Sequence, residues 1–154
     1  MATAEERLKE LNITLPAPPK PMAKYRTAVI IGNVLYTSGH GPAKVDDAPL
    51  VGRVGDDLTL EQGKACARAV GIGILSTVQE AIGSLNKVKR LLKTLGMVNC
   101  TADFKEQPQV INGFSELMAE VFGEENGVGA RSAVGMGSLP GNIPVEIECI
   151  FEIE

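Results

Sequence analysis

The last ten residues of the chain alternate between apolar and mostly acidic side chains. Four glutamates and Ile150 separate the apolar residues, which are Val145, Ile147, Cys149, Phe151 and Ile153. Successive side chains of a strand point to opposite faces of its sheet, so a period of two places the apolar set on one face. The pattern predicts a C-terminal strand that is buried on one side only.

Two longer stretches have the spacing of helices. Residues 108–122 carry apolar side chains at intervals of three and four, which predicts one buried helical face. A second helix is expected to begin at Thr59, because Thr59 and Gln62 have the spacing of a capping box, and to continue to about Gly83. Ala and Gly recur through residues 65–73 of this helix. We therefore expect it to lie close to a sheet or to another helix.

The N-terminal residues are predicted to form a short helix followed by an extended connector. Thr3 and Glu6 make another capping box, which predicts a short helix over residues 3–12. The proline-rich residues 15–22 cannot continue this helix and are expected to be an extended connector. We expect residues 1–22 to form an N-terminal arm and residues 23–154 to form one domain.

Several shorter stretches have the character of strands. Residues 27–31 and 34–38 flank Gly32-Asn33, which predicts a two-residue hairpin. Weaker patterns predict strands over 50–54 and 132–138. The turn residues 139–142 then predict that the last two strands form a simple hairpin near Gly141. The local pattern of residues 86–99 suits a helix and a strand equally well.

The composition suits a globular protein without a basic surface. The 154 residues include 15 Lys and Arg against 19 Asp and Glu, which gives a net charge of −4. This balance and the small number of aromatic residues weigh against a nucleic-acid partner. No apolar run approaches the ~18 residues of a membrane span, and the charged N-terminus lacks the apolar core of a signal peptide. We expect a cytoplasmic protein with no membrane partner.

The three cysteines Cys66, Cys100 and Cys149 are far apart, and the chain has one histidine. Without a CxxC pair or further histidines, a zinc site is not expected, nor is a closed disulfide framework. We expect reduced cysteines that are mostly buried, because a free cysteine behaves as a small apolar residue.

The common catalytic motifs are missing: no phosphate loop, no HExxH and no GxSxG occur. Arg131, at the start of a predicted strand, could hold a small carboxylate through two parallel hydrogen bonds or could pair with a surface acid. Glu146 could be functional or could be one of several solvated glutamates. His40 could be catalytic or bonded within its loop, and Asn112 could be a ligand or an exposed amide.

Four short motifs together resemble the Rid/YjgF family. They are Tyr36-Thr37-Ser38-Gly39, Val110-Ile111-Asn112, Ala130-Arg131-Ser132-Ala133-Val134 followed by Ser138-Leu139-Pro140, and Val145-Glu146-Ile147-Glu148. The members are reactive-intermediate (enamine/imine) deaminases, once called L-PSP endoribonucleases, and the resemblance spans about residues 25–154. It implies an α+β, chorismate-mutase-like fold in which two helices pack on one face of a mixed sheet, with residues 88–99 as a strand. The short N-terminal helix is added to this fold.

The resemblance also implies an activity. It implies a homotrimer with clefts between subunits that hydrolyses small 2-imino or enamino acids to 2-keto acids and ammonia, with no metal and no cofactor. By position, Arg131 matches the arginine that binds the substrate carboxylate, and Glu146 matches the glutamate that positions or activates water. The remaining residues expected to bind substrate in the cleft are Ser38, Asn112, Tyr25 and His40. In a simple hairpin, Arg131 and Glu146 would lie too far apart to touch one small molecule, so we expect them to act from different subunits.

The sequence also departs from the family pattern. His40 stands where many members have Gln, and Ala133 stands where many deaminases have Cys. Gly135-Met136-Gly137 replaces a bulkier segment, and the arm is longer than in compact members. A second hypothesis therefore remains, in which a non-catalytic trimer binds a small carboxylate metabolite for sensing. Ribonuclease activity, the older family label, is disfavoured by the acidic charge and the lack of paired histidines.

Overall fold

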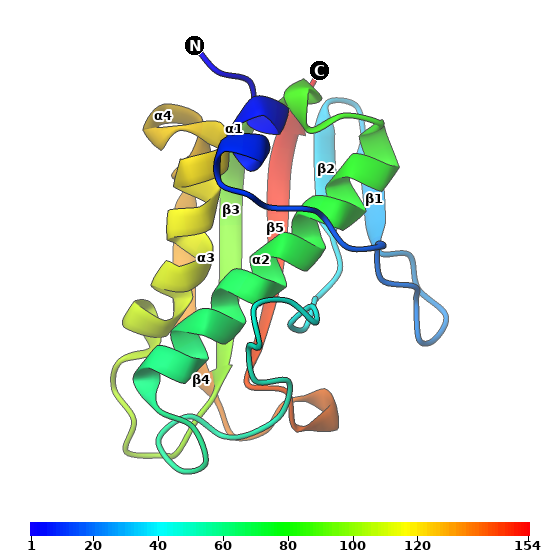
Figure 1. Ribbon diagram of the computed structural model, residues 1–154. Coiled ribbons are helices and arrows are strands. Elements are labelled where there is room, and N and C mark those ends of the chain that lie inside the picture. The colour runs from blue at the N-terminus through cyan, green and yellow to red at the C-terminus, as the bar shows by residue number, and fades with distance from the viewer.

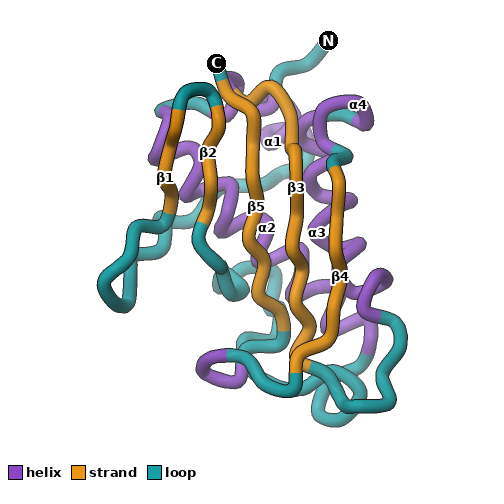
Figure 2. Tube along the Cα trace, turned by 180° about the vertical axis from the view of Figure 1, so that it is seen from behind, coloured by secondary structure: helices purple, strands orange, loops and turns teal.

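A computed structural model describes all 154 residues, and its centre is one five-stranded mixed sheet. The strand order is β1 (Ala28–Ile31), β2 (Val34–Thr37), β5 (Val145–Ile153), β3 (Val88–Asn99) and β4 (Ala130–Met136). β3 and β4 run parallel, and all other neighbours are antiparallel. Figure 1 shows the long helices on one side of the sheet, and Figure 2 shows the other side without a helix. The expected α+β fold with helices on one face is confirmed.

The strand predictions are confirmed in part. The hairpin of β1 and β2 around Gly32-Asn33 is present, and residues 88–99 form a strand, which only the family resemblance had indicated. The strand predicted over 50–54 is wrong, since only Val54 makes isolated bridges there. Gly52 and Gly55 have φ values of 130° and 93°, and these positive angles break the extended path on either side of Val54.

The predicted hairpin between the last two strands is also wrong. β4 pairs with β3 and makes no pair with β5, because β3 lies between them. The chain leaves β3, forms the helix α3 (Gln107–Phe122) and returns to a strand parallel to β3. A crossover through a helix is the usual way to connect parallel neighbours. The short 3-10 turn at Pro140–Asn142 therefore crosses from one side of β3 to the other.

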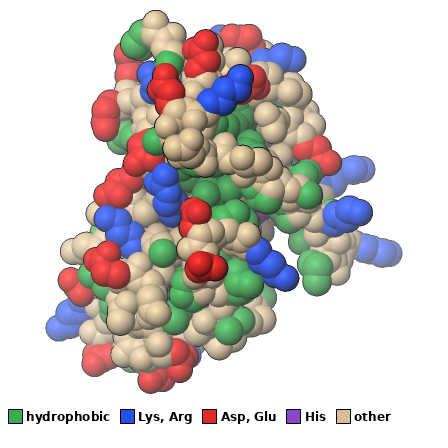
Figure 3. All heavy atoms as spheres, in the orientation of Figure 1, with side chains coloured by type: hydrophobic (Ala, Val, Ile, Leu, Met, Phe, Trp, Pro, Cys, Tyr) green, Lys and Arg blue, Asp and Glu red, His purple; other side chains and the backbone are tan.

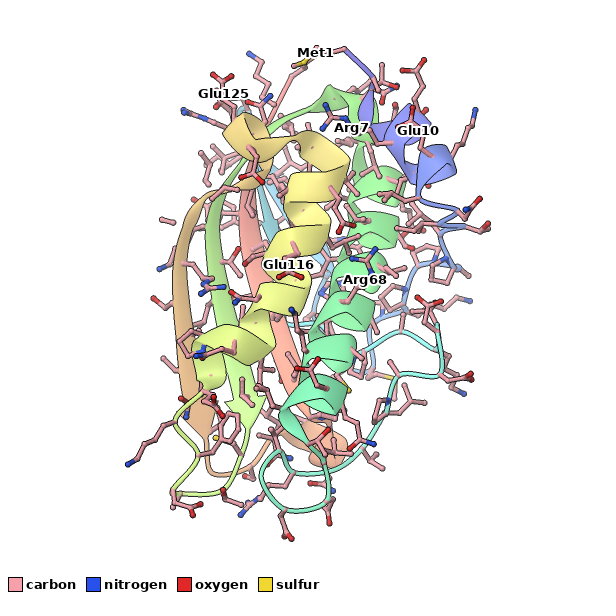
Figure 4. The ribbon with its side chains drawn as sticks, turned by 60° about the vertical axis from the view of Figure 1, so that its left-hand side comes forward. Met1, Arg7, Glu10, Arg68, Glu116 and Glu125 are labelled. Carbon is pink, nitrogen blue, oxygen red and sulfur yellow. The ribbon has the colours of Figure 1, made fainter.

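Two long helices cover the sheet. α2 (Leu60–Ile82) begins with the expected capping box of Thr59 and Gln62, and α3 follows the predicted apolar stripe. Their close approach is visible at Gly113, where a Cβ atom would collide with the backbone carbonyl of Lys64 in α2. Figure 4 shows Arg68 of α2 and Glu116 of α3 on the outer side of this helix pair. There the helices are joined by the ion pairs Lys64–Glu116 and Arg68–Glu120.

The apolar character of α2 is explained by the core. By length and composition alone this helix could cross a membrane, with a mean hydropathy of 1.2 over 18 residues. However, 67% of that stretch is buried inside the fold, against α3 and the sheet. A helix that is apolar on most sides is expected at the centre of a globular core.

The N-terminal arm lies against the helix layer. Its helix α1 (Ala4–Glu10) has the capping box of Thr3 and Glu6, and Leu8 is buried in the core. The following connector crosses α2 (Figure 1), where the Ser76 hydroxyl donates a hydrogen bond to the carbonyl of Pro16 at 2.9 Å. The arm is therefore packed on the domain and not detached from it.

The three cysteines are free and buried, as expected from their spacing. Burial raises the pKa of the Cys66 thiol to about 12 and raises that of Cys149 as well. The thiolate is the reactive form of cysteine, so both side chains have the character of inert core residues.

Candidate functional site

The register of the sheet assigns Arg131 and Glu146 to opposite faces. Directly paired residues share a face, so Arg131, which pairs with Thr94, lies on the helix-covered side. Glu146 pairs with Met97 and lies on the uncovered side, as Glu148 does. Thr94 and Met97, the β3 partners of Arg131 and Glu146, lie about 10 Å apart along the strand, and β4 and β5 are separated by two strand spacings, about 10 Å across the sheet. Arg131 and Glu146 of one chain therefore cannot contact the same small molecule.

Arg131 forms a cluster with α3. The Nη1 group of Arg131 donates hydrogen bonds to Asn112 Oδ1 at 2.9 Å and to Ser115 Oγ at 3.1 Å. All its partners are neutral, and none of the three ion pairs of the chain includes Arg131. The surface salt bridge considered from the sequence is therefore not observed. Because Nη1 is held by α3, the Nε–H and Nη2 groups of this exposed side chain stay available to bind a carboxylate.

Glu146 lies against the backbone at the end of the first hairpin. A Cβ atom on Gly39 would overlap Glu146 Oε2, and it would lie 3.0 Å from Cδ and 3.2 Å from Cγ. Only a glycine at position 39 permits this approach. Partial burial, assisted by the charge of Glu148, raises the pKa of the Glu146 carboxyl. A carboxylate with a raised pKa is better matched to proton transfer near neutral pH than an ordinary glutamate is.

His40 and Ser38 hold the loop that contains Gly39. The His40 ring is buried, with Nδ1 2.7 Å from the Ser38 carbonyl and Nε2 2.8 Å from Thr77 Oγ1. A carbonyl only accepts, so Nδ1 carries the proton and Thr77 donates to Nε2. Burial lowers the pKa of His40, against the opposing effect of the Ser38 hydrogen bond. The Ser38 hydroxyl donates to the Arg26 carbonyl at 2.5 Å, so both side chains are engaged within the chain.

Tyr25 lies on the other side of this loop, at a cavity of about 520 Å³. The cavity is formed by the arm and by the segment that follows Ser38, with Gly73 of α2 behind it. The Tyr25 hydroxyl accepts a hydrogen bond from the backbone N–H of Met22 at 3.2 Å, which leaves its own proton free to donate. Tyr25 and His40 both line this cavity, and so does Gly39.

The candidate residues thus form two groups. Arg131 and Asn112 lie together at the β4 edge, whereas Ser38, His40, Tyr25 and Glu146 lie around Gly39 on the β2 and β5 side. No group of three or more His, Cys, Asp or Glu side chains is placed to hold a metal ion.

Sequence reasoning missed three residues of these groups: Ser115, Thr77 and Gly39. Ser115 follows Asn112 by three positions, and residues at this spacing share a helical face, so the sequence contained a signal for it. Thr77 contacts His40 across 37 residues, and no local pattern indicates such a pair. Gly39 was part of a recognised motif, but its function depends on the position of Glu146.

The chain is similar to known proteins over most of its length. The sequence profile of the YjgF/chorismate mutase-like family matches residues 5–149. The chain belongs to this family. Protein TCP17 of Trypanosoma cruzi is 40% identical over 146 residues, which are 95% of this chain and 91% of that protein. A 2-iminobutanoate/2-iminopropanoate deaminase of Dermatophagoides farinae is 30% identical over 145 residues, covering 92% and 95% of the two chains.

The fold is shared with solved structures of the family. The crystal structure of the protein Atu1372 from Agrobacterium tumefaciens has a TM-score of 0.88 at 42% sequence identity. The alignment covers 99% of this chain and 94% of that one, so it includes the N-terminal arm.

Proposed function

We propose that the protein hydrolyses small 2-imino acids to 2-keto acids and ammonia, in a site that two subunits of a homotrimer share. The observation that carries the proposal is the environment of Glu146, a carboxyl with a raised pKa pressed against the Gly39 backbone. Family membership and a relative named as an imine deaminase support the reaction class.

Arg131 is the residue proposed to bind the substrate carboxylate. Its guanidinium is exposed and has no acidic partner, and α3 holds one end of it through Asn112 and Ser115. The free edge presents two parallel donors, the arrangement that a carboxylate accepts best. Binding there would orient the imine carbon relative to the second group of residues, and orientation is a large part of catalysis for a reactive electrophile.

Glu146 is proposed to manage the proton. The water oxygen attacks the imine carbon of the protonated substrate, the C=N π electrons move to nitrogen, and Glu146 accepts a water proton. The amine nitrogen then takes this proton from Glu146, and ammonia leaves with the electrons of the C–N bond. As the carbonyl forms, the carboxylate of Glu146 accepts the proton of the hydroxyl group. Glu146 then passes this proton to ammonia, which leaves as ammonium. The raised pKa of Glu146 suits a group that must both accept and donate.

The geometry of a single chain supports a shared site. Arg131 and Glu146 lie on opposite faces of the sheet, so one of the two must come from a neighbouring subunit if both contact one substrate. The face without helices exposes large apolar side chains, which are Val29, Ile31, Tyr36 and Val134. Apolar groups on an uncovered sheet are typical of an association surface. We propose that this face is covered in the trimer, and that the protein acts in the cytoplasm without a nucleic-acid or membrane partner.

The decisive experiment follows the decay of enzymatically generated 2-aminoacrylate in the presence of the purified protein. We expect faster decay and faster release of ammonia, both abolished by Glu146→Gln. If the wild-type protein does not change the decay but binds 2-keto acids through Arg131, the deaminase proposal is wrong and the non-catalytic binding function replaces it.

A further inference from the structure

The charges of the chain are segregated along the sequence. Residues 11–45 contain four bases and no acid, whereas the remainder has 11 bases and 19 acids. The four bases are Lys20, Lys24, Arg26 and Lys44. None of them takes part in an ion pair. In Figure 3, basic side chains project from the right-hand side, where Figure 1 shows the loop between the arm and β1. This region is the part of an acidic protein that is suited to attract an anion.

The cavity of about 520 Å³ is lined almost entirely by this basic segment. Of its 14 lining residues, 13 come from positions 16–44, and Gly73 of α2 is the other. Lys20 and Lys44 contribute from the arm and from the loop after Gly39, and no acidic residue lines the cavity. Apolar surface comes from Pro16, Pro19, Met22 and Pro42. The cavity is therefore lined by two exposed lysines that form no ion pair and by a partly apolar wall.

This cavity adjoins the proposed catalytic group. Gly39 lines the cavity, and the carboxyl of Glu146, which is not itself a lining residue, contacts the same glycine from the uncovered face of the sheet. Its volume falls within the range of about 300–1,000 Å³ that is typical of pockets for drug-sized ligands. Arg131 and Glu146 do not line the cavity, so a three-carbon imino acid held by these two residues would leave it unfilled.

We propose that the cavity receives the side chain of the substrate, and that Lys20 and Lys44 select 2-imino acids with a second carboxylate in that side chain. The inference rests on the proposed function, since it extends the same site. The reaction is the same hydrolysis, with water as the only co-reactant. Tyr25, whose hydroxyl proton is free at the cavity wall, adds a neutral donor for the second carboxylate.

The first test measures binding without chemistry. Titration calorimetry compares 2-oxoglutarate, a five-carbon dicarboxylate, with 2-oxobutanoate, which has the same keto acid group and no second charge. We expect wild-type protein to bind the dicarboxylate about tenfold more tightly, because each charge-assisted contact favours it. The double variant Lys20→Met, Lys44→Met should lose this preference. The matched control is Lys24→Met, which removes a charge of the same segment outside the cavity and should keep it.

The second test measures the reaction. Amino acid oxidases generate 2-iminoglutarate or 2-iminobutanoate, and the ratio of their kcat/KM values is compared between the wild type and the double variant. We expect the ratio to fall about tenfold in the variant, because only the dicarboxylate uses the two lysines. Equal affinity of the wild type for both keto acids would overturn the inference, even if both imines are hydrolysed. A preference for the dicarboxylate that the double variant loses, without any imine hydrolysis, would instead overturn the deaminase proposal and leave the anion site in place.

Discussion

Replacing Gly39 by alanine tests the contact between the first hairpin and Glu146. The backbone of residue 39 has no positive φ, so an alanine fits its conformation. Its methyl group, however, would overlap Glu146 Oε2 and lie 3.0 Å from Cδ, inside the ordinary contact distance of 3.4 Å. The carboxylate must therefore retreat by about 1 Å or more, and a displacement of this size can reduce a rate ~100-fold. That loss corresponds to about 2.7 kcal/mol of transition-state stabilisation.

The assay measures kcat/KM for imine decay in Gly39→Ala, with thermal unfolding as a check of the fold. Glu146 is partly exposed and can swing toward solvent, so we expect the melting temperature to change little. The matched control is Gly137→Ala, because a Cβ atom there meets nothing within 4 Å. Wild-type kcat/KM in a folded Gly39→Ala protein would refute the reasoning, since the position of the carboxylate would then have no effect on the reaction.

Four further predictions concern charge and packing. Arg131→Ala should abolish carboxylate binding and catalysed imine decay in a folded protein. Arg131→Lys should retain part of both, because a point charge cannot reproduce two parallel hydrogen bonds. Titration with 2-oxobutanoate measures the affinity of each variant. Glu148→Gln should move the acid limb of the pH–rate profile to lower pH, since the charge of Glu148 helps to raise the pKa of Glu146. Burial holds the pKa of His40 below its ordinary value of 6.5, so below that pH the unfolded chain takes up a proton that the folded chain does not. The free energy of unfolding should therefore fall as the pH drops below 6.5. Urea unfolding of His40→Gln should show less of this pH dependence. Gly113→Ala should lower the free energy of unfolding by roughly 1–3 kcal/mol, because the methyl group meets the backbone of α2.

The sequence predicted the elements that have a strong local pattern. The alternating C-terminal strand and the helix over 108–122 are present, because burial of one face imposes a period on the sequence. The capping boxes at Thr3 and Thr59 correctly marked the starts of two helices. Residues 88–99 had no decisive period, because register shifts between Val88 and Arg90 and between Leu91 and Lys93 interrupt the alternation of side chains along β3.

Apart from the strand predicted over 50–54, the errors concern the pairing of elements and not their identity. The turn residues near Gly141 suggested a hairpin, but the choice of strand neighbours is made by the packing of α3 over β3 and β4. Most candidate residues were taken from motifs, and the structure divides the candidates between the β4 edge and the region around Gly39, with Arg131 and Glu146 on opposite faces of the sheet. The environment of Glu146 could not be predicted, because it depends on Gly39, which is distant in sequence and adjacent only in the fold.

The measurement that tests the central claim most directly is complementation in mixed trimers. Arg131→Ala chains and Glu146→Gln chains are unfolded together, mixed in equal amounts and refolded, with each variant refolded alone as the control. In a ring of head-to-tail contacts, about a quarter of the clefts then combine an intact Arg131 with an intact Glu146. The shared site predicts that each variant alone is inactive and that the mixture recovers imine hydrolysis toward a quarter of the wild-type rate. A mixture that forms trimers of both chains and stays inactive would contradict a site built from two subunits.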